Sequence, residues 1–104
     1  MVASDTIRRM ADRIVERFRP EKVIVFGSCA RGTATADSDV DFLVVMPLRD
    51  SRLKTCVEIR KVLRGFGVPK DVMVLTPAEF ERFKDLPGSL AYPAAHEGRV
   101  LYAA

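Results

Sequence analysis

Three short apolar runs limit how this chain can fold more than any other feature. They are KVIVF at 22–26, DVDFLVVM at 39–46 and KDVMVLT at 70–76, and each is followed directly by glycine or proline. β-Branched and aromatic residues favour strands, whereas glycine and proline end them. KVIVF has no polar position inside it, which is typical of a strand buried on both faces. We therefore expect three strands at these places.

Two segments carry apolar residues at helical spacing. The first covers 4–19 and is closed by Pro20, and the second begins at a cap formed by Asp50 or Ser51 and is broken by the glycines at 65 and 67. The apolar stripes are Ile7, Met10, Ile14, Val15 and Phe18 in the first, and Leu53, Cys56, Ile59, Val62, Leu63 and Phe66 in the second. Both patterns predict amphipathic helices.

The last third of the chain predicts another helix and a final strand. Thr76 is a helix cap, Pro77 occupies the first helical position, and Glu79 stands three residues after the cap. Beyond this helix we expect a short helical piece interrupted near Pro93, and then RVLY at 99–102 as an edge strand.

This order of elements predicts an α+β fold with a small mixed sheet and helices packed mainly on one face. We expect residues 1–104 to form one domain, with a hydrophobic fraction of 48% that supplies a small core. The apolar runs are shorter than the ~20 residues that cross a bilayer, so no membrane partner is expected.

Charge and cysteine content bear on the partners and the compartment. The net charge of +3 suits a phosphate-bearing ligand but gives no direct evidence for nucleic-acid binding. Cys29 and Cys56 lack metal-ligand spacing and no signal peptide pattern precedes them. These features favour a reduced, cytoplasmic protein.

Gly27 and Ser28 follow the first expected strand at the start of a predicted helical turn. Such a turn aims free backbone N–H groups and a hydroxyl at one spot, an arrangement that binds phosphate. A simple tight turn is the alternative for this pair taken alone.

Asp39 and Asp41 stand two positions apart at the start of the second expected strand, so their side chains share one face. Two carboxylates this close repel, and a shared proton, a basic side chain or a bound cation must compensate. Oxygen ligands fixed on a strand match Mg²⁺. The alternative is that Asp39 caps the loop and Asp41 faces solvent at a strand edge.

Asp71 stands alone among apolar residues in the third expected strand. A third carboxylate in an adjacent strand would allow a second cation to bind. The alternative is that Asp71 begins the strand while still in water.

The stretch GSCARGTATADSDVD, from Gly27 to Asp41, resembles the signature of nucleotidyltransferases of the DNA polymerase beta superfamily, in which Gly-Ser is followed after ten residues by Asp-x-Asp. The length and the PGSLAY…EGRVLY ending resemble minimal nucleotidyltransferases, which are often encoded beside a HEPN-domain protein. The resemblance implies a polymerase beta palm-like fold. It also implies catalytic, metal-binding carboxylates at Asp39, Asp41 and Asp71, and phosphate contacts at Gly27 and Ser28.

The resemblance implies two Mg²⁺ ions per site and a nucleoside triphosphate, expected to be ATP, as the substrate. Arg31 is a further candidate for contacting the triphosphate, with a structural ion pair as its alternative. A helix N-terminus can lower the pKa of a thiol, but we assign Cys29 a packing role and no chemistry. His96 is expected at the surface or as a cap, because Mg²⁺ takes oxygen ligands.

We therefore expect an enzyme that transfers AMP from ATP to a hydroxyl of a partner protein and acts as the antitoxin of a HEPN-domain toxin. One alternative is a module that binds nucleotide and neutralises its partner by contact alone. Another is a transferase that modifies a small molecule or RNA. A homo-oligomer assembled through 99–102 or the first helix is a weaker expectation.

Overall fold

A four-stranded sheet forms the centre of the computed structural model, which describes residues 4–32 and 39–104. The strands are β1 (Lys22–Phe26), β2 (Val40–Val45), β3 (Lys70–Leu75) and β4 (Arg99–Ala103), and their order across the sheet is β3-β2-β1-β4. β1 pairs antiparallel with both β2 and β4, while β2 pairs parallel with β3. The sheet is therefore mixed, and β4 is an edge strand, as the sequence predicts.

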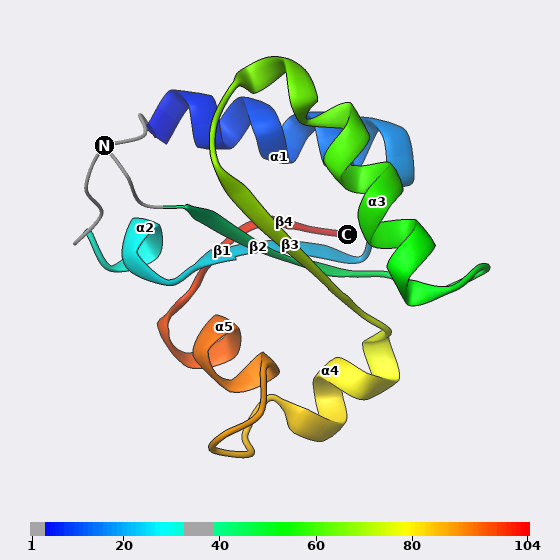
Figure 1. The fold of residues 1–104 in the computed structure, drawn as a ribbon. Helices are drawn as coiled ribbons and strands as arrows, with labels where there is room; N and C mark the ends of the chain where they lie inside the picture. The colour runs from blue at the N-terminus through cyan, green and yellow to red at the C-terminus, as the bar shows by residue number, and fades with distance from the viewer. Residues whose placement is uncertain (1–3, 33–38) are drawn as a thin grey trace.

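Helices lie on both faces of the sheet (Figure 1). The helical segments are α1 (Ser4–Phe18), α2 (Ser28–Arg31), α3 (Arg52–Val62), the short 3₁₀ helix η1 (Arg64–Phe66), α4 (Pro77–Phe83) and α5 (Ala91–Glu97). The two longest, α1 and α3, share one face, and the short helices α4 and α5 lie on the other (Figure 1). The expected α+β fold is confirmed, with most of the helical residues on one face.

Alternation along β2 divides the core into two layers. Val40, Phe42 and Val44 are fully buried and pack in the cluster that includes α1 and α3. Leu43 and Val45 pack against residues of α4 and α5 in the second cluster. Successive side chains of a strand point to opposite faces, so this pattern also fixes the face on which Asp41 lies.

The helix starts follow their predicted caps, with one correction near the C-terminus. Ser51 accepts a hydrogen bond from the Lys54 N–H, and Thr76 with Glu79 forms a complete capping box. Pro93 does not interrupt the helical piece as expected, because α5 begins at Ala91. Proline in the first turn lacks only an N–H that would have no partner inside the helix.

Two arginines of α3 reach residues of the edge strand β3 and beyond it. Arg52 donates to the Val74 carbonyl oxygen at 2.8 Å and forms a two-pronged ion pair with Glu79 of α4. Arg60, two turns later, pairs with Asp71 of β3 at 2.6 Å. The contacts lie along the β3 edge of the sheet, where the unpaired backbone groups of an edge strand could otherwise bind another strand.

None of the helices in the described ranges has the length and apolar character needed to span a membrane.

Candidate active site

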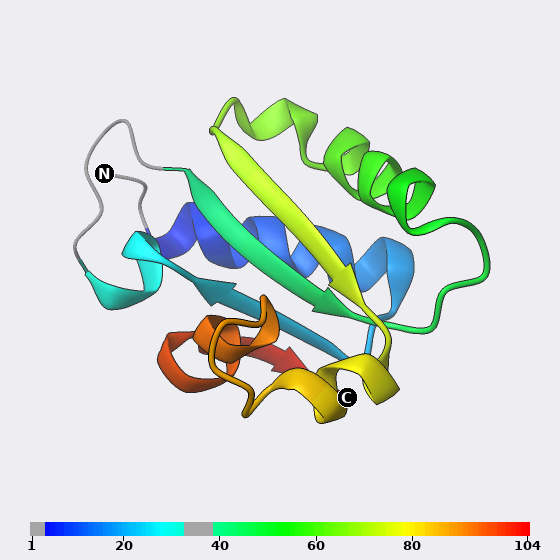
Figure 2. The same ribbon diagram turned by 60° about the horizontal axis from the view of Figure 1, so that its bottom comes forward.

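The predicted site residues gather at one end of the sheet (Figure 2). Gly27 directly follows β1, Asp39 directly precedes β2, and Asp41 and Asp71 lie near the starts of β2 and β3. In the strand register, Asp41 pairs with Phe26 on one side and with Asp71 on the other. Neighbouring strands lie about 4.8 Å apart, and paired residues point to the same face. The register therefore puts Asp41 and Asp71 side by side, and Gly27, directly after Phe26, lies next to the Asp41 carboxylate.

This end of the sheet is open to solvent. Asp39 is exposed, Asp41 is half-buried, and the side chain of Asp71 is 53% exposed. Leu43, two residues further along β2 on the same face as Asp41, is fully covered in the cluster with α4 and α5. The short helices thus cover the apolar part of this face and leave the carboxylates accessible to a ligand.

The Asp41 carboxylate lies close to the backbone of Gly27. Gly27 has φ 74° and ψ −154°, a backbone conformation that is essentially restricted to glycine. A Cβ atom at this position would lie 2.5 Å from Asp41 Oδ2, closer than atoms can pack. Only glycine therefore allows the Asp41 carboxylate to reach the turn between β1 and α2.

The thiol of Cys29 is affected by the same carboxylates. It donates a 3.5 Å hydrogen bond to the Asp39 carbonyl oxygen. Burial raises its pKa above the usual value, and the negative charges of Asp41 and Asp39 raise the pKa further. The pKa of this thiol is thus raised rather than lowered at the helix start.

Asp71 is held by an ion pair that sequence reasoning missed. Its Oδ1 accepts a 2.6 Å hydrogen bond from Nη2 of Arg60 in α3. No sequence signal marks this pair, because a separation of eleven positions gives no helical or strand relation between the two residues. The partner of Asp71 depends on how α3 lies along β3.

The donor set suits a hard divalent cation, although the carboxylates are not gathered as three ligands. In the described ranges no three His, Cys, Asp or Glu side chains lie close enough together to hold a metal ion. Mg²⁺ commonly takes only one or two protein carboxylates and completes its shell with water and phosphate oxygens. Asp39 and Asp41 fit that requirement, whereas Asp71 is paired with Arg60 through Oδ1.

Ser28 and Arg31 begin and end the four-residue helix α2. Ser28 is half-buried beside Gly27, and the Ala30 N–H donates to the Gly27 carbonyl oxygen at 3.1 Å. The side chain of Arg31 lies outside the described part of the structure, as do residues 33–38. His96 is exposed and pairs with Asp85 at 2.9 Å, far along the chain from the site.

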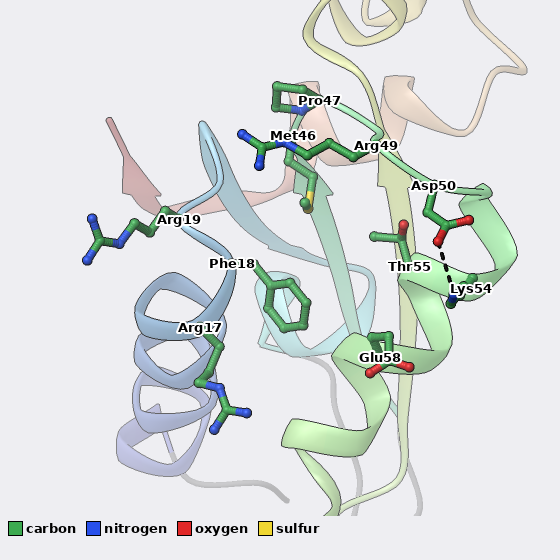
Figure 3. A pocket seen from close by; sticks show the side chains of 10 residues that line it. All are labelled: Arg17, Phe18, Arg19, Met46, Pro47, Arg49, Asp50, Lys54, Thr55 and Glu58. Carbon is green, nitrogen blue, oxygen red and sulfur yellow. Dashed lines mark ion pairs between the residues drawn. The ribbon is translucent and has the colours of Figure 1, made fainter.

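Surface pockets of the described residues include one of about 490 Å³ and one of about 360 Å³. The larger of these lies at the opposite end of the sheet (Figure 3). It is formed by the end of α1, the loop after β2 and the first turns of α3. Its basic side chains are Arg17, Arg19, Arg49 and Lys54, and Lys54 pairs with Asp50. None of the site residues predicted from the sequence lines it.

Known proteins resemble the chain in sequence and in fold. A family model described as a nucleotidyltransferase domain matches residues 7–100. A protein of Methanocaldococcus jannaschii named "Putative protein adenylyltransferase" is 37% identical over 87 residues, which are 83% of this chain and 82% of that protein.

Solved structures share the fold at low sequence identity. A "putative nucleotidyltransferase" from Sulfolobus solfataricus has a TM-score of 0.65 at 20% identity, covering 95% of this chain and 78% of that chain. A toxin-antitoxin structure with AMP-PNP has a TM-score of 0.65 at 16% identity, covering 93% of this chain and 73% of that chain.

Proposed function

The chain belongs to the family of nucleotidyltransferase domains, and we propose that this enzyme transfers AMP from ATP to a hydroxyl of a partner protein in a Mg²⁺-dependent reaction. The relative named as a protein adenylyltransferase supports both the nucleotide and the protein acceptor. The partner is a HEPN-domain toxin, and the chain acts as its antitoxin in the cytoplasm. A shared fold with the MntA-HpeT toxin-antitoxin complex supports a toxin as the partner.

The observation that carries the proposal is that Asp41 of β2 lies between Asp71 of β3 and the turn at Gly27 that follows β1. The N–H groups after Gly27 and the Ser28 hydroxyl bind the phosphates of ATP at this turn. Asp39 and Asp41 hold Mg²⁺, which would neutralise charge on the triphosphate oxygens. Asp71, on the β3 side of Asp41, lies beside the acceptor hydroxyl.

The reaction is an in-line displacement at the α-phosphorus. The acceptor oxygen forms the new P–O bond while the bond from the α-phosphorus to the bridging oxygen breaks, and pyrophosphate leaves. The acceptor proton passes to the Asp71 carboxylate. The Arg60 guanidinium engages Oδ1 of this carboxylate, and opening the ion pair would make both carboxylate oxygens available to the acceptor.

The test uses wild-type protein and Asp41→Asn, each incubated with Mg²⁺, α-labelled ATP and the HEPN-domain protein encoded by the adjacent gene. Wild type should label the partner protein, and Asp41→Asn should not. The variant should keep its stability, because it removes a charge that repels Asp39. Equal labelling by both proteins would refute the role of Asp41.

The contact-only alternative predicts a different result in the same assay. A complex between the chain and its partner would then form without any label entering the partner. Omitting Mg²⁺ or replacing it by a chelator separates the metal requirement from partner binding. Labelling that persists in the chelator would refute Mg²⁺ dependence.

A further inference from the structure

The smaller pocket, about 360 Å³, is strongly basic and lies beside Asp71. Its lining side chains are Val57, Arg60, Lys61, Arg64 and Lys70, with no carboxylate among them. Arg60 connects the pocket to the site through its 2.6 Å contact with Asp71. Within the described part of the chain, Arg64 has no carboxylate partner, and Lys61 pairs only with Glu58 at 3.4 Å.

An apolar strip continues this basic pocket along α3. Leu53 is 75% exposed and Val57 is 41% exposed, and they stand one helical turn apart. We call these six residues, Leu53, Val57, Arg60, Lys61, Arg64 and Lys70, the α3 surface. Its combination of aliphatic contacts and a charged rim is typical of protein interfaces. Single-stranded nucleic acid is held by stacking on aromatic side chains, and the α3 surface contains none.

The strand order places the α3 surface on the acceptor side of the site. β1, which leads into the proposed phosphate-binding turn, lies on one side of β2, and β3 lies on the other. In-line displacement requires the attacking oxygen to approach opposite the leaving pyrophosphate. If pyrophosphate leaves over Gly27, the acceptor arrives from the β3 side, where α3 lies along the strand (Figure 2).

We infer that the α3 surface is the docking site for an acidic segment of the protein acceptor, an inference that rests on the proposed function. Carboxylates of the acceptor pair with Lys61, Arg64 and Lys70, and an aliphatic residue covers Leu53. An acidic group of the segment also competes with Asp71 for Arg60. Docking therefore frees Asp71 at the moment when the acceptor hydroxyl arrives.

The test compares two double charge reversals. Lys61→Glu with Arg64→Glu changes the α3 surface, and Arg17→Glu with Arg49→Glu makes the same change of net charge at the pocket on the opposite end of the sheet. Transfer is measured with saturating Mg²⁺ and ATP over a range of concentrations of the HEPN-domain protein. Circular dichroism and melting temperature confirm that each variant is folded.

The α3 variant should raise the KM for the acceptor by about tenfold or more, because like charges then face each other across the interface. The KM for ATP should stay within about twofold, and the control should change neither value by more than that. Raising the salt concentration should raise the acceptor KM of wild type and leave that of the α3 variant nearly unchanged. Equal effects of the two double variants would overturn the inference.

Failure of the docking surface can be told apart from failure of the proposed function. If wild type labels no protein, the proposed function fails, and calorimetric binding of the same partner to wild type and the α3 variant then tests docking directly. Equal affinities would overturn the docking surface. Loss of RNA retention by the α3 variant, with protein labelling unchanged, would assign the surface to nucleic acid and refute the inference.

Discussion

Replacing Gly27 by alanine should disturb both the backbone and the Asp41 carboxylate. Forcing a residue with a Cβ into φ 74°, ψ −154° costs on the order of 1–3 kcal/mol. The new Cβ would also lie 2.5 Å from Asp41 Oδ2, and displacing that carboxylate adds about 1 kcal/mol. We expect Gly27→Ala to lower the free energy of unfolding by about 3 kcal/mol.

Gly32 provides a matched control at the other end of α2. Its φ of 75° is also positive, but its ψ of 16° lies in the left-handed helical region, and no described atom lies within 4 Å of a Cβ placed there. Gly32→Ala should therefore lower the free energy of unfolding by only about 1 kcal/mol. Urea unfolding of both variants measures the difference.

A double-mutant cycle isolates the contact with the carboxylate. In an Asp41→Ala background, Gly27→Ala should lower the free energy of unfolding only by the cost of the strained backbone. The coupling energy between the two substitutions should therefore be about 1 kcal/mol. Gly27→Ala alone should also abolish nucleotide transfer, whereas Gly32→Ala should retain it. Equal destabilisation by the two glycine variants, together with zero coupling, would refute the argument that Gly27 is required to admit Asp41.

Three further predictions concern stability and ligand binding. The Arg52 guanidinium and the Thr76 N–H lower the pKa of Glu79 to about 2, so its contribution is complete above about pH 4.5 and is lost as the pH falls towards 2. Glu79→Gln should lower the free energy of unfolding by about 1 kcal/mol at pH 7, a modest value because the Glu79 side chain is 33% exposed. In urea unfolding, the difference in this free energy between wild type and the variant should disappear near pH 2. Ile14→Ala, at a fully buried site, should lower the free energy of unfolding by about 3 kcal/mol, whereas Leu53→Ala should change it by less than about 0.5 kcal/mol. Equal losses of unfolding free energy in the two variants would contradict the assigned core. Mg²⁺ with AMP-PNP at about 100 times its Kd should raise the melting temperature of wild type by roughly 10 °C, and an equal rise in Asp41→Asn would argue against the metal site.

Local sequence patterns determined much of the secondary structure. The apolar runs became β1, β2 and β3, and the segments with amphipathic stripes became α1 and α3. Leu53 was wrongly assigned to the apolar stripe of α3, because it is 75% exposed at the first turn of that helix. The turn at Gly27 could also be predicted, because a glycine turn is a property of neighbouring residues. The shared face of Asp39 and Asp41 stays a prediction. Pro93 was misjudged because its effect depends on where the helix begins, and the hydrogen bond from the Tyr92 N–H to the Ser89 hydroxyl at that start was not anticipated.

Only the tertiary structure decided which distant residues meet. Antiparallel pairing of β1 with β2 brought Asp41 against Gly27, and parallel pairing of β3 with β2 put Asp71 beside Asp41. The ion pair of Asp71 with Arg60, and the basic pocket next to it, follow from α3 lying along the β3 edge. The sequence by itself determined the GS…DxD motif and its place at one turn and strand. The surroundings of this motif were decided by strand order and helix packing. Both depend on burying the apolar faces of elements that are far apart in the sequence.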